Sequence, residues 1–134
     1  MTIALTADDA RKDLMVQFCT AYAGLLSGHT FVATSTTGNM VAKATGLDVL
    51  CLMPGHSGGY HQLLHRICYG EVDMLLAFRN PKQTEPRHLQ AFQELMRACD
   101  DQSVPVATSI ATAEVLVQGL AHGDLDWRMI KSGK

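Results

Sequence analysis

The stretch Thr30–Asn39 reads TFVATSTTGN: a short apolar run, then hydroxyl side chains, a glycine and an amide. Short apolar runs that end in small or polar residues are typical of buried parallel strands. Residues 38–45, which follow, have the spacing of a helix. The stretch therefore predicts a buried strand whose carboxyl end leads directly into a helix.

The same pattern recurs along the chain. Four more apolar runs precede small or polar residues: TIAL (2–5), VLCLM (49–53), VDMLLAF (72–78) and VPVAT (104–108). Helical spacing is found near residues 14–25, 38–45, 59–69 and 87–102. Strands that alternate with helices form parallel sheets with right-handed crossovers. We expect one three-layer α/β/α domain over residues 1–134, with ligands at the carboxyl ends of the strands.

Composition argues against several classes of protein. Hydrophobic residues make up 47% of the chain and charged residues 18%, which is typical of a globular domain. The net charge of −2 gives no electrostatic reason to expect a nucleic acid partner. No stretch approaches the ~20 apolar residues of a membrane span, and the start, MTIALTADDA, lacks the pattern of a signal peptide. Cys19, Cys51, Cys68 and Cys99 have no C-x-x-C spacing, so we expect reduced, buried thiols and a soluble cytoplasmic protein without membrane contact.

The hydroxyl run TSTTGN (34–39) lies where a strand ends and a helix begins. Free backbone N–H groups at a helix N-terminus favour an anion, and small hydroxyl side chains add donors without blocking its approach. A phosphate or carboxylate would fit there. The alternative is that Thr37 is only an N-cap, which satisfies the same N–H groups without a ligand.

A second loop, PGHSGGYHQ (54–62), follows the next apolar run. Gly55, Gly58 and Gly59 permit close backbone approach or a positive φ, which larger residues resist. Because both loops follow strand ends on the same edge of a parallel sheet, we expect them to share a pocket.

These residues resemble the methylglyoxal synthase family. The resemblance covers roughly residues 3 to 118, through IALTADDARK, ATSTTGN, ATGLDV, GHSGGYHQ, GEVDMLLAF, FRNP and SVPVATSIATAEVL. It implies a five-stranded parallel sheet between helices and a homohexamer. It also implies conversion of dihydroxyacetone phosphate to methylglyoxal and inorganic phosphate, without a cofactor or metal.

The resemblance assigns phosphate binding to a group of residues that match the family's motifs: Lys12, Thr34, Thr36, Thr37, Gly38 and Gly55. Lys12 would supply a point charge for the phosphate, although a lysine there is also typical of a solvated surface. Pro54 replaces a serine that is usual in the second loop, which removes a hydroxyl and a backbone donor.

The catalytic carboxylates of the family are replaced. The family's base is the aspartate of a GGD motif, which takes a proton from the carbon beside the carbonyl; here the motif is GGY, with Tyr60 in its place. A phenol with a pKa near ~10 is a poor base at neutral pH. Asn80 replaces the aspartate of a DP pair, and Ala91 stands at a third acidic position.

Several other polar residues remain as candidates. Asp9 matches an aspartate after the first strand, and His88 matches the family's histidine. Asp8 stands where the family has histidine; Asp8 and Asp9 would equally serve a helix dipole, and His88 is also typical of a surface residue. Arg128 is a candidate for the family's C-terminal arginine, which reaches a phosphate.

New histidines appear beside Tyr60. His61 and His65 have a spacing that can bind a metal, but no third ligand is evident, so we expect no metal site. His56 lies in the loop and is a candidate base.

Two functions follow. The first is a protein that binds a small phosphorylated metabolite or phosphate, with synthase activity lost or low. The alternative is an active lyase with Asp9, His56 or His88 as a relocated base.

Overall fold

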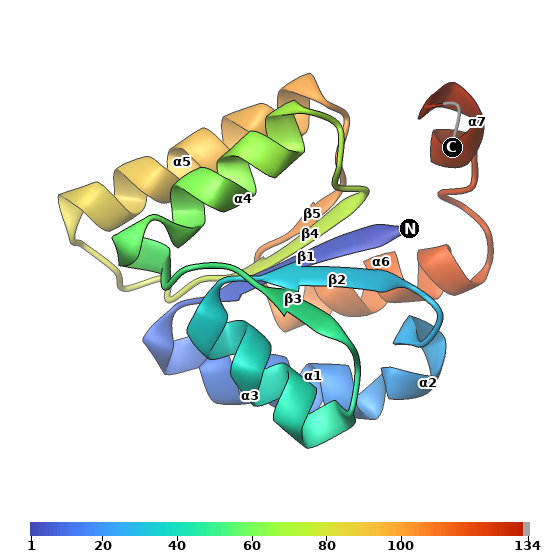
Figure 1. Cartoon of the computed structure of the whole chain (residues 1–134), viewed down its shortest axis with the longest axis horizontal. Helices are drawn as coiled ribbons and strands as arrows, with labels where there is room; N and C mark the ends of the chain where they lie inside the picture. Colours follow the sequence, from blue (N-terminus) through green and yellow to red (C-terminus); the bar gives the residue numbers. More distant parts are fainter. Residues whose placement is uncertain (133–134) are drawn as a thin grey trace.

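A computed structural model describes residues 1–132, and its strands form one parallel sheet (Figure 1). The strands are β1 (Thr2–Ala7), β2 (Thr30–Ala33), β3 (Val49–Cys51), β4 (Met74–Phe78) and β5 (Val106–Ala107). Their order in this five-stranded sheet is β3-β2-β1-β4-β5. Every neighbouring pair is parallel, which confirms the predicted α/β fold.

Helices cover both faces of the sheet (Figure 1). One face carries α1 (Lys12–Ala21), α2 (Ala23–Leu26), α3 (Ser35–Thr45) and α6 (Ile110–Ala121). The other face carries α4 (Gly59–Cys68) and α5 (Pro86–Asp101), and α7 (Trp127–Ser132) lies near the start of β1. Two short 3-10 helices, η1 (Asp9–Arg11) and η2 (Gly55–Ser57), precede α1 and α4.

The core divides into two apolar clusters, one on each face of the sheet. In β1, Ile3 and Leu5 belong to the cluster under α1, α3 and α6, whereas Ala4 belongs to the cluster under α4 and α5. Alternate side chains of a strand point to opposite faces, so a strand covered on both sides must be apolar throughout. This is why the strands read as continuous apolar runs.

The predicted helices differ from the observed ones at their ends. The helix expected near residue 38 begins at Ser35, so most of the hydroxyl run is the first turn of α3 rather than a loop. The helix α6 was missed because its apolar residues are spread around its circumference: Ala113 and Val117 are buried, whereas Val115 is 70% exposed.

The cysteines differ in exposure, and all are free. Cys19 and Cys99 are buried as expected, but Cys51 is half-buried and Cys68 is exposed, so the expectation of buried thiols is wrong for these two. Cys68 is the last residue of α4 and lies outside its buried stripe of Leu63 and Ile67. In the described part of the chain, no helix is both long and apolar enough to cross a membrane.

Candidate active site

A cleft of about 350 Å³ lies beyond the carboxyl ends of β1 to β4. It is lined by most of the residues that the sequence singled out: Asp9, Lys12, Thr34, Thr36, Gly55, His56, Tyr60, Asn80 and His88. The two loops expected to face each other, after β2 and after β3, therefore do share one pocket.

The N-terminus of α3 opens on this cleft without a side-chain cap. Thr34, not Thr37, is the N-cap residue, so the alternative that Thr37 is a simple cap is wrong. Thr34 makes no capping bond; its hydroxyl instead lies 3.1 Å from the Thr6 hydroxyl. The Ser35 amide donates to the Met53 carbonyl at 3.3 Å, but the amides of Thr36 and Thr37 have no acceptor within the helix. This end of α3 can hold an anion.

Thr37 and Gly38 are buried behind the first turn and do not line the cleft. Among the described residues, Thr37 Oγ1 is a buried side-chain oxygen without a hydrogen-bond partner. A Cβ at Gly38 would lie 2.8 Å from Cys51 Sγ and 3.1 Å from Ala33 Cβ. The glycine thus allows α3 to pack closely on β2 and β3.

Lys12 carries the positive charge of the cleft wall next to α3. Its Nζ donates to the Ala7 carbonyl at 2.7 Å and lies 3.1 Å from Asp9 Oδ1. The Lys12 side chain is 17% exposed, whereas that of Asp9 is fully exposed. An ammonium has three donors, so a donor remains for a phosphate oxygen.

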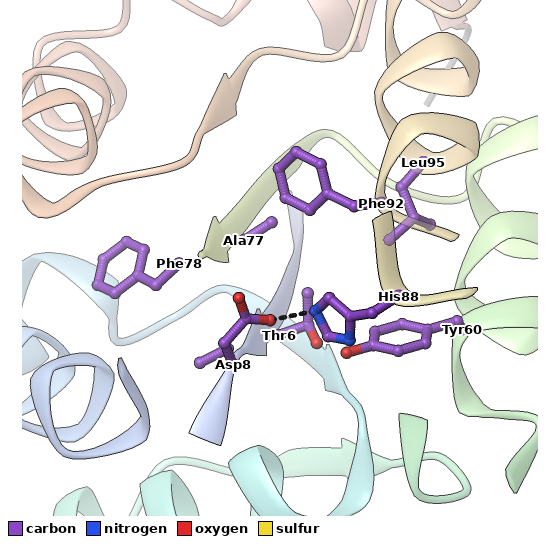
Figure 2. Close-up of a pocket in the computed structure, with 9 residues that line it drawn as sticks. Thr6, Asp8, Tyr60, Ala77, Phe78, His88, Phe92 and Leu95 are labelled. Atoms are coloured by element: carbon purple, nitrogen blue, oxygen red, sulfur yellow. Dashed lines mark hydrogen bonds and ion pairs between the residues drawn. The ribbon is translucent and has the colours of Figure 1, made fainter. Parts of the chain in front are cut away.

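Asp8, rather than Asp9, is the buried carboxylate of the pair. Its amide donates to the Phe78 carbonyl at 2.9 Å, which holds the residue at the end of β1. Oδ2 accepts the Asn80 amide at 2.6 Å, and Oδ1 accepts from His88 Nε2 (Figure 2). Asp8 received little weight from its sequence alone; the available signal was that it directly follows the apolar run of β1, whose residues 3–7 are buried.

His88 is held by the start of α5. Glu85 is the N-cap residue, and its carboxylate accepts the amides of Arg87 and His88 at 3.2 and 2.9 Å. These two backbone hydrogen bonds lower the pKa of Glu85. Pro86 follows at the first helical position, where a missing N–H has no cost. His88 is consequently buried and faces the cleft, not the surface.

Three rings gather at the far wall of the cleft. His88 Nδ1 lies 3.3 Å from His56 Nε2. The Tyr60 ring meets the His88 imidazole edge-on at a centroid distance of 5.7 Å (Figure 2), and it meets the His56 imidazole edge-on at 5.4 Å. Burial raises the pKa of Tyr60, and the negative charge of Asp8 raises it further. The phenol is therefore neutral at physiological pH and serves as a wall of the site.

Glycines let the second loop fold this closely. A Cβ at Gly55 would lie 2.8 Å from the Tyr60 ring, and one at Gly59 would lie 2.1 Å from the Met53 carbonyl oxygen. The sequence predicted such close approach at both positions.

The remaining candidates lie outside the cleft. Ala91 and His61 line a second hollow of about 210 Å³ between α4 and α5, which adjoins the cleft at Gly55, His56 and Tyr60. His65 stacks on Tyr69 with 4.4 Å between ring centroids. Within residues 1–132, no three His, Cys, Asp or Glu side chains are grouped so as to hold a metal. Arg128 lies at the opposite edge of the sheet, in an ion pair with Asp73.

The chain is similar to known proteins over most of its length. The MGS-like domain family matches residues 14–108. A methylglyoxal synthase of Caldicellulosiruptor saccharolyticus is 46% identical over 134 residues, which are 100% of this chain and 94% of that protein. One of Oceanobacillus iheyensis is 45% identical over 130 residues, or 97% and 92% of the two chains. The crystal structure of methylglyoxal synthase from Elizabethkingia anophelis superposes with a TM-score of 0.77 at 31% identity and covers 87% of this chain and 76% of that one.

The matched region runs from Leu14, within α1, to Thr108, just after β5, and it includes the hydroxyl-rich turn, the second loop and His88. Since the curated relatives match almost end to end, the chain belongs to the MGS-like domain family.

Proposed function

We infer that the protein is a carbon–oxygen lyase of the methylglyoxal synthase type, which converts dihydroxyacetone phosphate to methylglyoxal and inorganic phosphate. One observation carries the proposal: an anion site and a hydrogen-bonded set of acid–base side chains line the same cleft. The anion site is the start of α3 with Lys12, and the acid–base set is Asp8, His88 and His56.

The phosphate end of the substrate fits the first of these features. The uncapped amides of Thr36 and Thr37 and the helix dipole of α3 favour a dianion, and Lys12 adds a charged donor. The site needs no metal to neutralise the phosphate, and no cofactor is part of the proposal.

The other end of the substrate would meet the acid–base set. A base takes a proton from the hydroxymethyl carbon, and the electron pair of that C–H bond forms the double bond of an enediolate. The enediolate then expels phosphate by cleavage of the C–O bond to the phosphate group. The hydroxyl of the former hydroxymethyl carbon gives up its proton and becomes the aldehyde, and the departing phosphate takes up one proton. The methylene carbon of the resulting enolate takes up the proton held by the base, which gives methylglyoxal.

A protein that binds the phosphorylated ligand without turnover is the second candidate. It is favoured by the neutral Tyr60 phenol at the position of the family's base, whose removal typically costs 10²- to 10⁴-fold in rate. The lyase is preferred because relatives 44 to 46% identical bear the name methylglyoxal synthase. It is preferred also because the cleft holds other groups that can take a proton.

The test is an assay of methylglyoxal and phosphate release from dihydroxyacetone phosphate, beside calorimetric titration with that substrate and with inorganic phosphate. Saturable turnover supports the lyase. Saturable binding without turnover supports the binding protein, and neither binding nor turnover contradicts both.

A homo-oligomer in the cytoplasm, hexameric by the family resemblance, completes the proposal. Light scattering coupled to size-exclusion chromatography measures the subunit number, and a monomer contradicts this part alone.

A further inference from the structure

The three acid–base side chains at the far wall of the cleft form a single hydrogen-bonded chain with a defined direction. Asp8 Oδ1 is bonded to His88 Nε2, and His88 Nδ1 lies 3.3 Å from His56 Nε2. Asp8 and His88 are buried, with 7% and 9% of their side chains exposed, whereas His56 is exposed and lines the cleft. The chain therefore runs from a buried carboxylate to an accessible imidazole.

The chemistry of these groups fixes which nitrogen carries each hydrogen. An ionised carboxylate can only accept, so His88 Nε2 must donate to Asp8. In a neutral imidazole the other nitrogen is then an acceptor, so His88 Nδ1 accepts from His56 Nε2. The lone pair of His56 is then on Nδ1. This is the one imidazole nitrogen of the relay that makes no hydrogen bond to another member of the relay.

We propose that His56 is the general base of this protein and that Asp8 and His88 are positioning residues that hold it in the reactive tautomer. The proposal rests on the lyase function above and assigns its proton acceptor. When the substrate C–H bond breaks, the proton goes to His56 Nδ1 and the electron pair goes to the enediolate double bond. The proton on His56 Nε2 can then pass to His88 Nδ1, which places the positive charge next to the Asp8 carboxylate.

Two further features favour this assignment over the other polar groups. Asn80 donates its amide to Asp8 Oδ2 at 2.6 Å, so the carboxylate is fixed through both oxygens. The Asp9 carboxylate is instead fully exposed and paired with Lys12, at the phosphate side of the cleft. On this proposal Asp8 and His56 together perform the proton abstraction that the resemblance assigns to the aspartate of the GGD motif in the methylglyoxal synthase family.

Charged and titratable groups around His56 come from each element packed against it. Tyr60 of α4 meets its ring, and Arg87 and Glu85 lie at the start of α5 beside His88. The pKa of Glu85 is lowered first by the backbone hydrogen bonds of His88 and Arg87, and a protonated His56 adds to this lowering. Arg87 and Glu85 bring opposite charges to this end of α5, and the Asp8 carboxylate is linked to His56 through His88.

The experiment follows two signals with dihydroxyacetone phosphate: release of phosphate, and exchange of the hydroxymethyl hydrogen with solvent deuterium by proton NMR. The test variant is His56→Ala, and the matched control is His61→Ala, an exposed histidine of α4 that lies outside the cleft. We expect His56→Ala to lower both rates about 10²- to 10⁴-fold, with little change in KM or in the calorimetric affinity for inorganic phosphate. Added imidazole should restore part of the rate, and His61→Ala should match the parent.

The positioning role is tested with Asp8→Asn and its pH profile. Loss of the carboxylate removes negative charge that stabilises a protonated relay, so the acidic limb of the kcat/KM profile should move to lower pH while kcat falls. A merely structural role would lower the amount of folded protein without moving that limb. An unmoved limb in folded Asp8→Asn overturns the relay.

The outcomes separate the base assignment from the proposed function. Phosphate release and exchange that persist in His56→Ala overturn the base assignment and leave the lyase intact. The parent protein could instead exchange the hydrogen without releasing phosphate, and His56→Ala could lose that exchange. This result overturns the lyase and supports His56 as the base. Absence of both signals in the parent protein overturns both.

Discussion

Arg128 of α7 forms an ion pair with Asp73, with 3.4 Å between Nε and Oδ1, at the edge of the sheet opposite the cleft. The pair is buried, with 10% of the Arg128 side chain and 2% of the Asp73 side chain exposed. Asp73 Oδ2 also accepts the Thr2 amide at 2.9 Å, and Arg128 Nη1 donates to the Ser103 carbonyl. The pair thus joins α7 to the starts of β1, β4 and β5.

Arg128→Met should lower the free energy of unfolding by about 3–5 kcal/mol, because it removes the guanidinium that is paired with the buried Asp73 carboxylate. Affinity for inorganic phosphate should not change, since Arg128 does not line the cleft. Urea unfolding and calorimetry measure the two quantities. Addition of Asp73→Asn in the same protein should recover part of the stability. Weaker phosphate binding at unchanged stability would show that Arg128 serves the ligand instead.

Lys12→Met should weaken the binding of inorganic phosphate roughly 10- to 100-fold, because a hydrogen bond to a charged group contributes about 1.5–3 kcal/mol. Lys43→Met is the matched control, since Lys43 is an exposed lysine of α3 that does not line the cleft. Calorimetric titration at constant ionic strength gives both dissociation constants. If the two variants bind phosphate equally well, Lys12 does not contact the bound phosphate.

Gly59→Ala should destabilise the protein, because its Cβ would lie 2.1 Å from the Met53 carbonyl oxygen, a backbone atom that cannot rotate away. Overpacking costs about 1–3 kcal/mol and occasionally more. Gly24→Ala in α2 is the control, since a Cβ there meets nothing within 4 Å and alanine is a better helix former than glycine. Urea midpoints should fall for Gly59→Ala and stay or rise for Gly24→Ala. Equal urea midpoints would contradict the prediction, because they would mean that the backbone at Met53 can move away from the start of α4 without loss of stability.

Tyr60→Phe should retain most of the lyase activity. Burial and the Asp8 charge raise the pKa of the phenol, so it is already protonated at neutral pH and cannot be the base. Steady-state rates with dihydroxyacetone phosphate are the measurement. A loss in the 10²- to 10⁴-fold range expected for a base would assign the proton transfer to Tyr60. Tyr60→Asp alone should add little, because Asn80 of the cleft still stands where the resemblance places a second carboxylate.

Alkaline pH should destabilise the protein through two buried thiols. Burial raises the pKa of Cys19 and of Cys99 from 9.0 to about 12. The folded state therefore holds these protons more tightly than the unfolded state. Their contribution to stability is complete below pH 9.0, and it is lost as the pH rises toward about 12, at about 1.4 kcal/mol per pH unit for each thiol.

The measurement is urea unfolding as a function of pH. Cys19→Ala and Cys99→Ala should each flatten the decline of stability above pH 9.0, whereas exposed Cys68→Ala should keep the slope of the parent protein. At neutral pH a thiol reagent should modify Cys68 at once and reach the buried pair only after unfolding. Identical slopes in all variants would contradict the raised pKa values.

Local pattern was sufficient where one short segment decides the structure. The apolar runs predicted all the strands because a strand covered on both faces has to be apolar along its whole length. The glycines of the second loop and the hydroxyl residues of α3 marked the cleft because such residue types suit only a few backbone environments. The sequence pattern did not predict helix α6, because a nearly uniform apolar segment has no clear hydrophobic period.

Relations between distant segments depended on packing. The sequence favoured Asp9 as the carboxylate of the site and offered Thr37 as a possible cap; the fold instead buries Asp8, makes Thr34 the cap residue and moves Arg128 to the far edge. Neighbouring residues at a strand end point in different directions, and only the twist and spacing of the sheet determine which one meets α5.

The sequence by itself determined a parallel α/β domain with a hydroxyl-rich turn at the carboxyl end of a strand, since these follow from periodicity and residue type. Only the tertiary structure joined Asp8, His88 and His56, because they belong to segments up to 80 positions apart that meet at the carboxyl edge of one sheet.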